Sequence, residues 1–186
     1  MAHALAKPHL SVDDYLLWET DQPLRHDYVR GEVFAMTGGT LRHNRATLRC
    51  SLSFEQHLKG TPCKVFSGDV KVAVQETEHW FYPDVVVTCS AQDLADMNAT
   101  QVRAPVLVLE VLSPSTAVYD RGDKFLSLQK LASLQEYALL DAGAARLEVF
   151  RRNAAGRFEH FVFEGADTVA ELASIGWQGP VAALLD

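Results

Sequence analysis

Two carboxylates stand inside strongly apolar stretches of the chain, where a charged side chain is unusual. Asp84 belongs to the stretch 82–87, and Glu110 belongs to the stretch 105–112. Continuous runs of Val and Leu bounded by Pro and Ser are typical of strands that are buried on both faces. An unpaired charge in such a strand is costly, so each carboxylate is expected to have a partner.

Two kinds of partner fit these carboxylates on the sequence alone. One is a structural ion pair or a set of hydrogen bonds at a strand end. The other is a shared divalent cation, which requires neighbouring strands and side chains that face the same way. Asp84 follows Pro83 and so suits the first residue of its strand. Carboxylate oxygens favour hard ions such as Mg2+ or Mn2+, and no nearby His or Cys cluster favours zinc.

A lysine follows the second carboxylate within a predicted helix. Residues 113–116 break the strand after Glu110, and residues 120–126 predict a helix with Lys124 near its first turn. A cation gains nothing from the helix dipole at that position. Lys124 is therefore either a solvated side chain or is held in place by carboxylates. Asp, Glu and Lys at one point would form a metal-assisted site for phosphodiester hydrolysis.

Several motifs carry a resemblance to a known family. They are Pro83-Asp84 and the segments 28–33, 67–72, 109–116, 120–124 and 133–137, which together cover most of the chain. These motifs resemble those of the Uma-two family of bacterial proteins. The resemblance implies a restriction-endonuclease-like α/β fold, in which a mixed β-sheet is flanked by α-helices, with a PD-(D/E)xK type active site. It also implies Mg2+ as cofactor and nucleic acid, above all DNA, as substrate.

The resemblance assigns residues to the metal site. It implies that Asp84, Glu110 and the backbone carbonyl of Val111 hold Mg2+, for which Mn2+ could substitute. Leu112 stands where the general endonuclease pattern has its lysine. Lys124 on the following helix would then supply the missing ammonium group, either to orient the attacking water or to offset charge on the phosphate.

Two further catalytic candidates also have a simpler interpretation. Glu32 opens the second strand of a hairpin that turns at Arg30 and Gly31, and alone it predicts an exposed turn carboxylate. The family resemblance makes it a third acid at the metal site. His43 starts a predicted helix over residues 43–58. There it could donate a hydrogen bond to a phosphate or a bound water, or it could only form hydrogen bonds at the end of the helix.

The hydrophobic pattern predicts the elements that position these residues. Strands are expected over residues 25–36 (as a hairpin), 63–74, 80–88, 105–112, 136–140, 147–152 and 157–164. Helices are expected from Ser11 onward and over residues 43–58 and 124–131. Together these elements predict one mixed sheet flanked by helices, in a single domain over residues 1–186.

Composition limits the class of protein. The chain has 186 residues, of which 48% are hydrophobic and 22% charged, as in an ordinary globular domain. A net charge of −7 argues against a protein that coats nucleic acid without specificity, because phosphate neutralisation dominates such binding. The N-terminal segment lacks the apolar core of a signal peptide, and no stretch is long enough to span a membrane.

The cysteines suggest a compartment. Cys50, Cys63 and Cys89 are odd in number and widely spaced. They predict neither a zinc motif nor a disulfide framework, which favours a reducing cytoplasm.

Two classes of function stay open on the sequence. The first is a Mg2+-dependent DNA endonuclease, for which a two-fold homodimer is favoured if both strands of a duplex are cut. The second is a non-catalytic interaction or regulatory module that keeps the fold, which the negative charge and Leu112 favour. A metal titration separates the two classes, because an ion that binds the folded state stabilises it.

Overall fold

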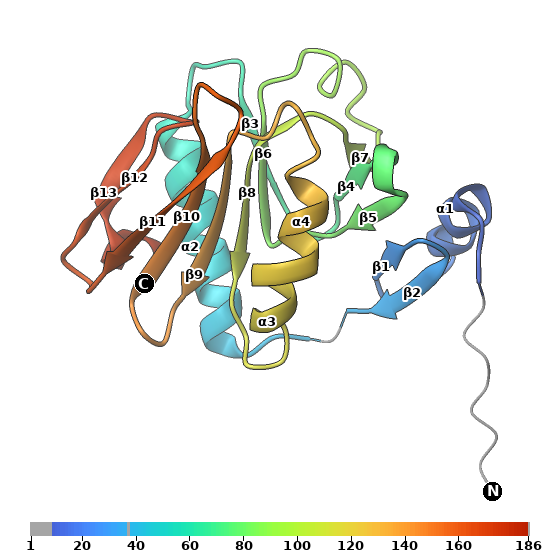
Figure 1. Ribbon diagram of the computed structural model, residues 1–186, viewed down its shortest axis with the longest axis horizontal. Helices are drawn as coiled ribbons and strands as arrows, with labels where there is room; N and C mark the ends of the chain where they lie inside the picture. The colour runs from blue at the N-terminus through green and yellow to red at the C-terminus, as the bar shows by residue number, and fades with distance from the viewer. Residues whose placement is uncertain (1–8, 37, 186) are drawn as a thin grey trace, which may run out of the picture.

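The computed structural model describes residues 9–36 and 38–185, and their elements form three sheets with helices on both sides (Figure 1). The α-helices within these residues are α1 (Val12–Thr20), α2 (Leu41–His57), α3 (Ala117–Tyr119) and α4 (Phe125–Leu128). Short 3-10 turns cover Gln75–Thr77 and Val181–Leu184. None of the helices in the described ranges is both long enough and apolar enough to cross a membrane.

The largest sheet has six strands in the order β11-β10-β9-β8-β6-β3. The strands are β3 (Lys64–Ser67), β6 (Val85–Thr88), β8 (Pro105–Val111), β9 (Glu136–Asp141), β10 (Arg146–Arg152) and β11 (Phe158–Glu164). Strands β8 and β9 run parallel, while β6 pairs antiparallel with β8. This sheet is therefore mixed, and the two acid-bearing strands are neighbours within it.

A second sheet has five strands in the order β2-β1-β5-β4-β7. The strands are β1 (His26–Val29), β2 (Glu32–Ala35), β4 (Lys71–Val74), β5 (His79–Phe81) and β7 (Gln101–Val102). A C-terminal hairpin of β12 (Val169–Leu172) and β13 (Trp177–Pro180) forms the third sheet. The prediction of one continuous mixed sheet is therefore wrong in this detail, although the mixed α/β class is confirmed.

Two predicted strands bend from one sheet into the other. The segment 63–74 divides into β3 and β4, and the segment 80–88 divides into β5 and β6. Gly68, with a φ of 76°, adopts a left-handed conformation at the first bend, where glycine meets no steric penalty. Tyr82, Pro83 and Asp84 form the second bend. Asp84 consequently lies at the junction of the two sheets.

Two layers cover the six-stranded sheet. Helix α2 packs on one face through Ala46, Cys50 and Phe54, which recur every four residues and so share one side of the helix. Helix α4 lies on the other face, where Leu128 packs with Val108. Figure 1 shows α2 and α4 on opposite sides of this sheet, with the smaller sheet beside α4.

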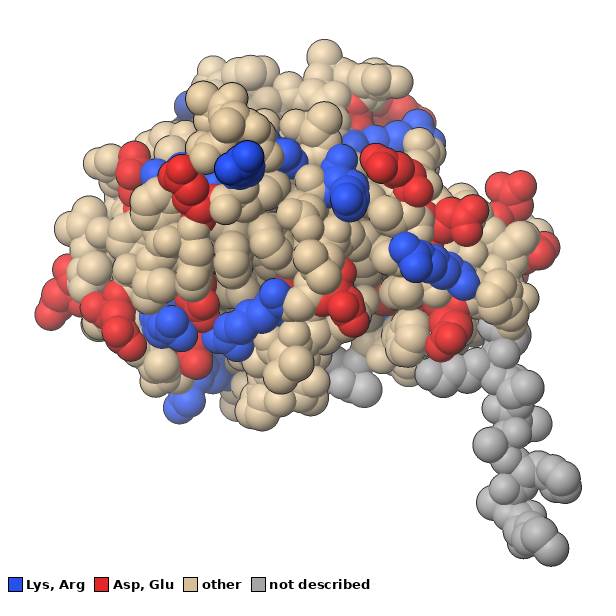
Figure 2. All heavy atoms as spheres, in the orientation of Figure 1, with Lys and Arg blue, Asp and Glu red and all other residues tan. Residues whose placement is uncertain are grey.

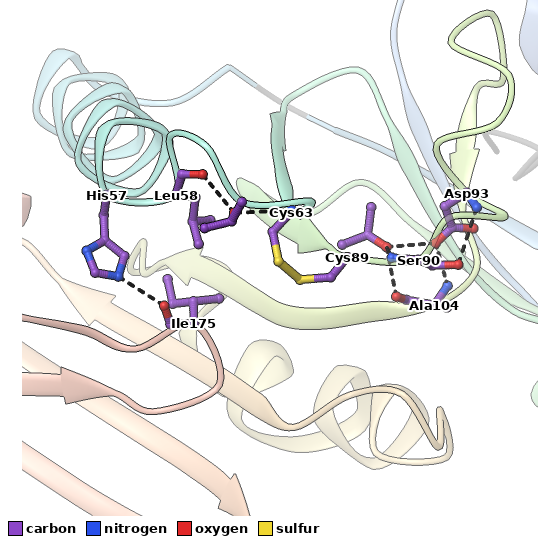
Figure 3. Close-up of a disulfide and its surroundings, with 10 residues drawn as sticks. His57, Leu58, Cys63, Cys89, Ser90, Asp93, Ala104 and Ile175 are labelled. Atoms are coloured by element: carbon purple, nitrogen blue, oxygen red, sulfur yellow. Dashed lines mark hydrogen bonds between the residues drawn. A yellow bond between two sulfur atoms is a disulfide. The ribbon is translucent and has the colours of Figure 1, made fainter.

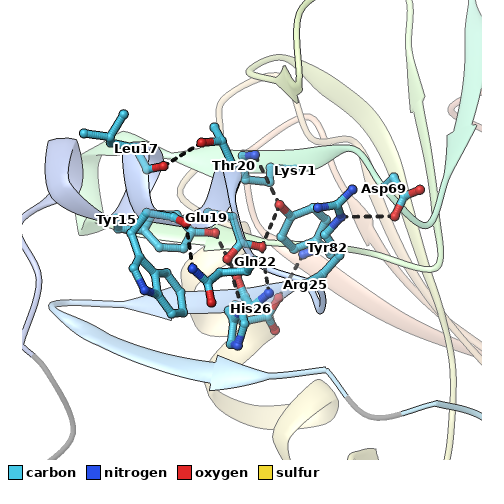
Figure 4. Close-up of polar contacts among 12 residues, drawn as sticks. Tyr15, Leu17, Glu19, Thr20, Gln22, Arg25, His26, Asp69, Lys71 and Tyr82 are labelled. Carbon is cyan, nitrogen blue, oxygen red and sulfur yellow. Dashed lines mark hydrogen bonds and ion pairs between the residues drawn. The ribbon is translucent and has the colours of Figure 1, made fainter.

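A buried polar network fixes α1 against the second sheet and against Tyr82 (Figure 4). Glu19 accepts the backbone N–H of His26 at 2.9 Å and the hydroxyl of Tyr82 at 3.0 Å. Lys71 Nζ donates to the same hydroxyl at 3.2 Å. Burial raises the pKa of Tyr82, so this hydroxyl keeps its proton and can donate to Glu19. The network therefore anchors Tyr82, two residues before Asp84.

The helical segment before and after Lys124 differs from its prediction. Helix α3 begins at Ala117, and a wider π-helical turn over Asp120–Lys124 joins it to α4. Gly122 interrupts the turn, with φ of −108° and ψ of −105°. Lys124 lies inside this segment instead of in a first turn. Isolated π-helical turns occur frequently at functional sites.

The structure contains a disulfide that the cysteine spacing did not predict (Figure 3). Cys63 and Cys89 are bonded, while Cys50 is free and buried. The reason is the register of β3 and β6, which pairs Lys64 with Thr88 and so sets the two cysteines opposite each other. The expectation of no disulfide is wrong, and the cytoplasmic location that it favoured stays a prediction.

Candidate active site

Asp84 and Glu110 extend from adjacent strands toward the same face of the six-stranded sheet. Val85 pairs with Leu109 in the antiparallel register of β6 and β8, which sets Asp84 opposite Glu110. Glu110 Oε2 accepts the backbone N–H of Asp84 at 3.4 Å. The pairing of these two strands therefore brings both carboxylates to one point at the end of β6.

Lys124 reaches the same point from the helical segment above the sheet. Its side chain is only 5% exposed, and Nζ lies 2.7 Å from Glu110 Oε1 and 3.9 Å from Asp120 Oδ1. The ammonium group also lies over the ring of Phe81, 5.6 Å from the ring centroid. Lys124 is thus buried among carboxylates and does not extend into solvent.

His43 and Val111 hold one oxygen of Asp84. The backbone N–H of Val111 donates to Oδ2 at 2.7 Å, and His43 Nε2 lies 3.2 Å from the same atom. Thr40 caps α2 by accepting the His43 backbone N–H at 3.2 Å, which fixes the first turn of the helix. Among the described residues, none donates a hydrogen bond to Asp84 Oδ1. One carboxylate oxygen is therefore free to take a ligand.

Two acids that the sequence analysis did not single out join the cluster. Asp27 on β1 is buried, and its Oδ1 accepts the backbone N–H of Tyr82 at 2.9 Å. Asp120 is buried in the π-helical turn, where its backbone carbonyl accepts the Tyr137 hydroxyl at 2.9 Å. The sequence gives no signal for Asp27, which stands among polar residues of a hairpin strand. Asp120 was assigned only to the start of a helix.

Glu32 is not part of this cluster. It is exposed at the first position of β2, where it pairs with Val29. Asp27, on the facing strand β1, contributes the carboxylate that the hairpin brings to the site. The third acid is therefore on the other strand of the predicted hairpin.

One cavity of about 1040 Å³ contains the whole cluster. Its wall includes His43, Asp84, Glu110, Val111 and Lys124, together with Asp27 and Asp120. Ligand pockets usually measure roughly 300–1000 Å³, so this cavity can hold more than a single phosphate group. On the face of the molecule drawn in Figure 2, acidic and basic side chains are interspersed and form no continuous basic field.

The buried charges shift one another's titration. Burial opposes the charged form of Lys124, but the carboxylates of Glu110, Asp27 and Asp120 outweigh it and raise the pKa of Lys124. Burial raises the pKa of Glu110, while the Lys124 ammonium opposes the shift. Lys124 consequently remains a cation.

The contact with Asp84 also affects His43. This hydrogen bond raises the pKa of His43, although partial burial of the ring acts in the opposite direction. The imidazolium form is therefore favoured, in keeping with a position beside a carboxylate.

The chain matches the sequence model of a protein family. The sequence model of Uma2, the Uma-two family named above, carries the description "Putative restriction endonuclease" and matches residues 12–182. This match spans nearly the entire chain. The chain belongs to the Uma2 family.

Relatives of this Uma2 protein occur in Synechocystis sp., and each carries the name "Uncharacterized protein". One is 38% identical over 170 residues, covering 91% of this chain and 87% of the relative. Another is 30% identical over 143 residues, covering 77% of this chain and 81% of the relative. The Uma2 description supports a nuclease-like function for this chain.

A solved structure confirms the fold of the Uma2 protein. A crystal structure from Anabaena variabilis, described as "a putative nuclease belonging to DUF820", superimposes with a TM-score of 0.78 at 18% identity. The superposition covers 95% of this chain and 97% of the other. The restriction-endonuclease-like α/β fold predicted from the motifs therefore agrees with the architecture of an independent protein.

The acid cluster of this Uma2 protein fits a hard divalent cation. Glu110 Oε1 is buried and faces the Lys124 ammonium at 2.7 Å, and Asp84 Oδ1 has no donor among the described residues. In the described part of the chain, no three His, Cys, Asp or Glu side chains form a complete metal cage. Mg2+ commonly takes only one or two carboxylates and retains several waters. Two carboxylates and a backbone carbonyl are thus a sufficient donor set.

Proposed function

We propose that this Uma2 protein is a Mg2+-dependent endonuclease that hydrolyses phosphodiester bonds in DNA. The observation that supports the proposal is the convergence of Asp84, Glu110 and Lys124 in one cavity, with Lys124 Nζ 2.7 Å from Glu110. The carboxylates of Asp84 and Glu110 would hold the cation, and the buried ammonium of Lys124 would face the phosphate. When bound, Mg2+ supplies Lewis acidity and lowers the pKa of a coordinated water.

The carboxylates would act as ligands and as positioning groups. Asp84 offers Oδ1, because Val111 and His43 already hold Oδ2 and thereby fix the carboxylate plane. Glu110 offers the oxygens of a side chain that is held between strand and helix. The Val111 carbonyl would complete the donor set, as the family resemblance implies. Held in this way, the ligands need little rearrangement before the reaction.

Lys124 and His43 would act on the substrate side of the cavity. Lys124 stays charged in a buried position, so its ammonium can bind a phosphate oxygen on which negative charge develops. A buried cation stabilises such charge more strongly than one in water. His43 would orient Asp84 and donate a hydrogen bond to water or phosphate, since its raised pKa favours the protonated ring.

Cleavage assays with matched variants test the proposal. Purified protein would be incubated with single-stranded, duplex and branched DNA in the presence of Mg2+, of Mn2+ or of EDTA. We expect cleavage that EDTA abolishes and that Asp84→Asn or Glu110→Gln reduces by at least about a thousandfold. Glu55→Gln, an exposed carboxylate on α2, is the control and should cleave normally.

Two results of these assays would contradict the proposed function. Wild-type protein that binds Mg2+ but cleaves none of these DNAs would overturn the proposal and favour the interaction module. Cleavage that survives both substitutions would show that the reaction takes place elsewhere.

A homodimer remains a separate prediction, which sedimentation of the protein with and without duplex DNA would check.

A further inference from the structure

The cavity has a second end that the proposed hydrolysis does not use. Along β1, Asp27 lines the acidic end, and Arg30 lines the cavity three residues later. Along the helical segment, Lys124 is followed on the wall by Ser127 and then by Lys130. Two elements therefore lead away from the acids toward basic and hydroxyl side chains, so the cavity is acidic at one end and basic at the other.

Strand β5 also runs between the acidic and the basic end of the cavity. Phe81 lies under the Lys124 ammonium, and His79, two residues away on the same strand, contacts Phe81 edge to face. His79 Nδ1 is hydrogen-bonded to Ser127 Oγ, and Ser127 Oγ lies 3.0 Å from Thr77 Oγ1. These contacts join β5 to α4 one helical turn beyond Lys124. The basic end is thus an ordered continuation of the active-site wall.

The His79 ring retains an unused polar atom. Nε2 is buried and has no hydrogen-bond partner among the described residues. Burial of the ring and the nearby charge of Arg30 lower the pKa of His79. An anion beside the ring would favour the protonated form, in which Nε2 carries a hydrogen that can be donated. This wall therefore has the capacity to bind one more polar group.

Arg30 and Lys130 are both available to an anion. Neither side chain forms an ion pair or a hydrogen bond with any residue in the described ranges. Arg30 is held in place by its backbone, which donates to the Glu78 carbonyl at 3.0 Å. Val29, the residue before Arg30, pairs with His79 across strands β1 and β5. Arg30 therefore lies next to His79. Arg30 thus comes from the turn after β1 and Lys130 from the turn after α4, and both line the cavity together with His79.

We propose that Arg30, His79 and Lys130 form a subsite for a backbone phosphate of the nucleic acid strand, on one side of the scissile bond. The inference rests on the proposed nuclease function and adds where the strand runs. From Asp27 to Arg30, β1 advances about 10 Å. Charges along one nucleic acid strand are spaced by about 3.4 Å along the helix axis. The subsite therefore recognises a phosphate within about three nucleotides of the cut.

Binding measurements with neutralised phosphates test the subsite. Oligonucleotides with a single methylphosphonate at each of three positions on either side of the cleaved bond remove one charge at a time. Affinity would be measured by fluorescence anisotropy with Ca2+ in place of Mg2+, so that cleavage is suppressed. We expect one position at which wild-type affinity falls about tenfold, the size of a lost charge-assisted contact.

Variants assign that contact to residues. Arg30→Gln and Lys130→Gln should each weaken binding of the unmodified oligonucleotide about tenfold and make it insensitive to the critical methylphosphonate. Each should also reduce the slope of log affinity against log salt by about 0.7 to 1. Arg157→Gln and Lys64→Gln remove exposed cations outside the cavity and serve as matched controls. They should keep the wild-type sensitivity.

The outcomes separate this inference from the proposed function. If wild-type protein cleaves DNA but Arg30→Gln and Lys130→Gln behave like the controls, the subsite is wrong and the nuclease stands. If the wild-type protein neither binds nor cleaves any oligonucleotide, both proposals fall. Loss of methylphosphonate sensitivity in the two cavity variants, with normal thermal unfolding, supports the subsite.

Discussion

Glu110 and Glu136 are both buried glutamates on neighbouring strands of one sheet, yet their surroundings differ in kind. Glu110 on β8 meets one ammonium, that of Lys124, and one backbone N–H at 3.4 Å. Glu136 on β9 is saturated with donors on both oxygens. They are Arg151 Nε at 2.6 Å, Ala173 N at 3.1 Å, Ser174 N at 2.9 Å and Ser174 Oγ at 2.6 Å.

The two glutamates show that burial alone does not identify a functional carboxylate. Glu136 links β9 to the segment that follows β12. The hydrogen bonds that it accepts all come from groups of the protein itself. Glu110 has only two partners, the Lys124 ammonium on Oε1 and the Asp84 N–H on Oε2, and burial raises its pKa. A buried carboxylate with unused capacity is costly unless a ligand uses it. The number of donors therefore separates a structural acid from a candidate ligand.

The largest effect on stability should follow from Glu136→Gln. The substitution leaves Arg151 without its carboxylate and sets an amide group against the backbone donors of Ala173 and Ser174. We expect the free energy of unfolding to fall by about 3 kcal/mol, as when one partner of a buried ion pair is removed. Urea unfolding at pH 7 measures the loss.

Glu110→Gln is the matched comparison. It exchanges the Glu110 carboxylate for an amide, and Lys124 keeps Asp120 as an ion-pair partner and the nearby charge of Asp27. We expect the free energy of unfolding to change by less than about 1 kcal/mol. Equal losses for the two variants would contradict the distinction between structural and functional glutamates.

Metal binding should sharpen the same distinction. At a Mg2+ concentration of 100 times Kd, linkage adds about 2.7 kcal/mol to the free energy of unfolding. We expect this gain in wild-type protein and in Glu136→Gln, because the structural glutamate is no ligand. Asp84→Asn should lose it. Thermal unfolding across a Mg2+ titration checks all three proteins, and a gain that persists in Asp84→Asn would exclude this cluster as the metal site.

The smallest effect concerns a third buried glutamate, Glu148 on β10. Burial alone would raise the pKa of Glu148, but hydrogen bonds and the charge of Arg121 lower it, with help from Arg146 and His160. A lowered pKa stabilises the folded state above the unfolded value of about 4.3, and the contribution disappears as the pH falls through the folded value. The contribution should be about 1 kcal/mol or less, because Arg121 is partly exposed.

Unfolding by urea at pH 3, 4, 5 and 7 checks this pH dependence. The difference in stability between wild type and Glu148→Gln should be constant from pH 5 to 7 and should shrink below pH 4. A difference that grows toward low pH would show that the sign is wrong.

The sequence predicted the acid-bearing strands better than it predicted their sheets. The apolar runs predicted a strand at each acid, but that the two strands are neighbours was only a condition of the metal-site hypothesis, and the pairing of β6 with β8 meets it. The bend at 82–84 left no signal, because residues on both sides of it are buried and apolar. Hydrophobic periodicity reports burial, and it does not report which of two sheets provides the burial.

The additional acids and the disulfide were missed for a related reason. Asp27 is buried only because the chain at Tyr82 returns to it from 55 residues away, which no local pattern encodes. Cys63 and Cys89 become neighbours through strand pairing across 26 residues. Glu32 follows the turn as predicted, yet the register turns it to solvent. Long-range register decides each of these cases.

The cavity can form only after the bend at Tyr82, Pro83 and Asp84 has brought the two sheets together. Asp27 comes from one sheet and Glu110 from the other, so neither sheet assembles the acid cluster alone. Lys124 arrives only after two thirds of the chain has been synthesised. Every part of the proposed site must therefore be made and folded before the proposed hydrolysis can begin.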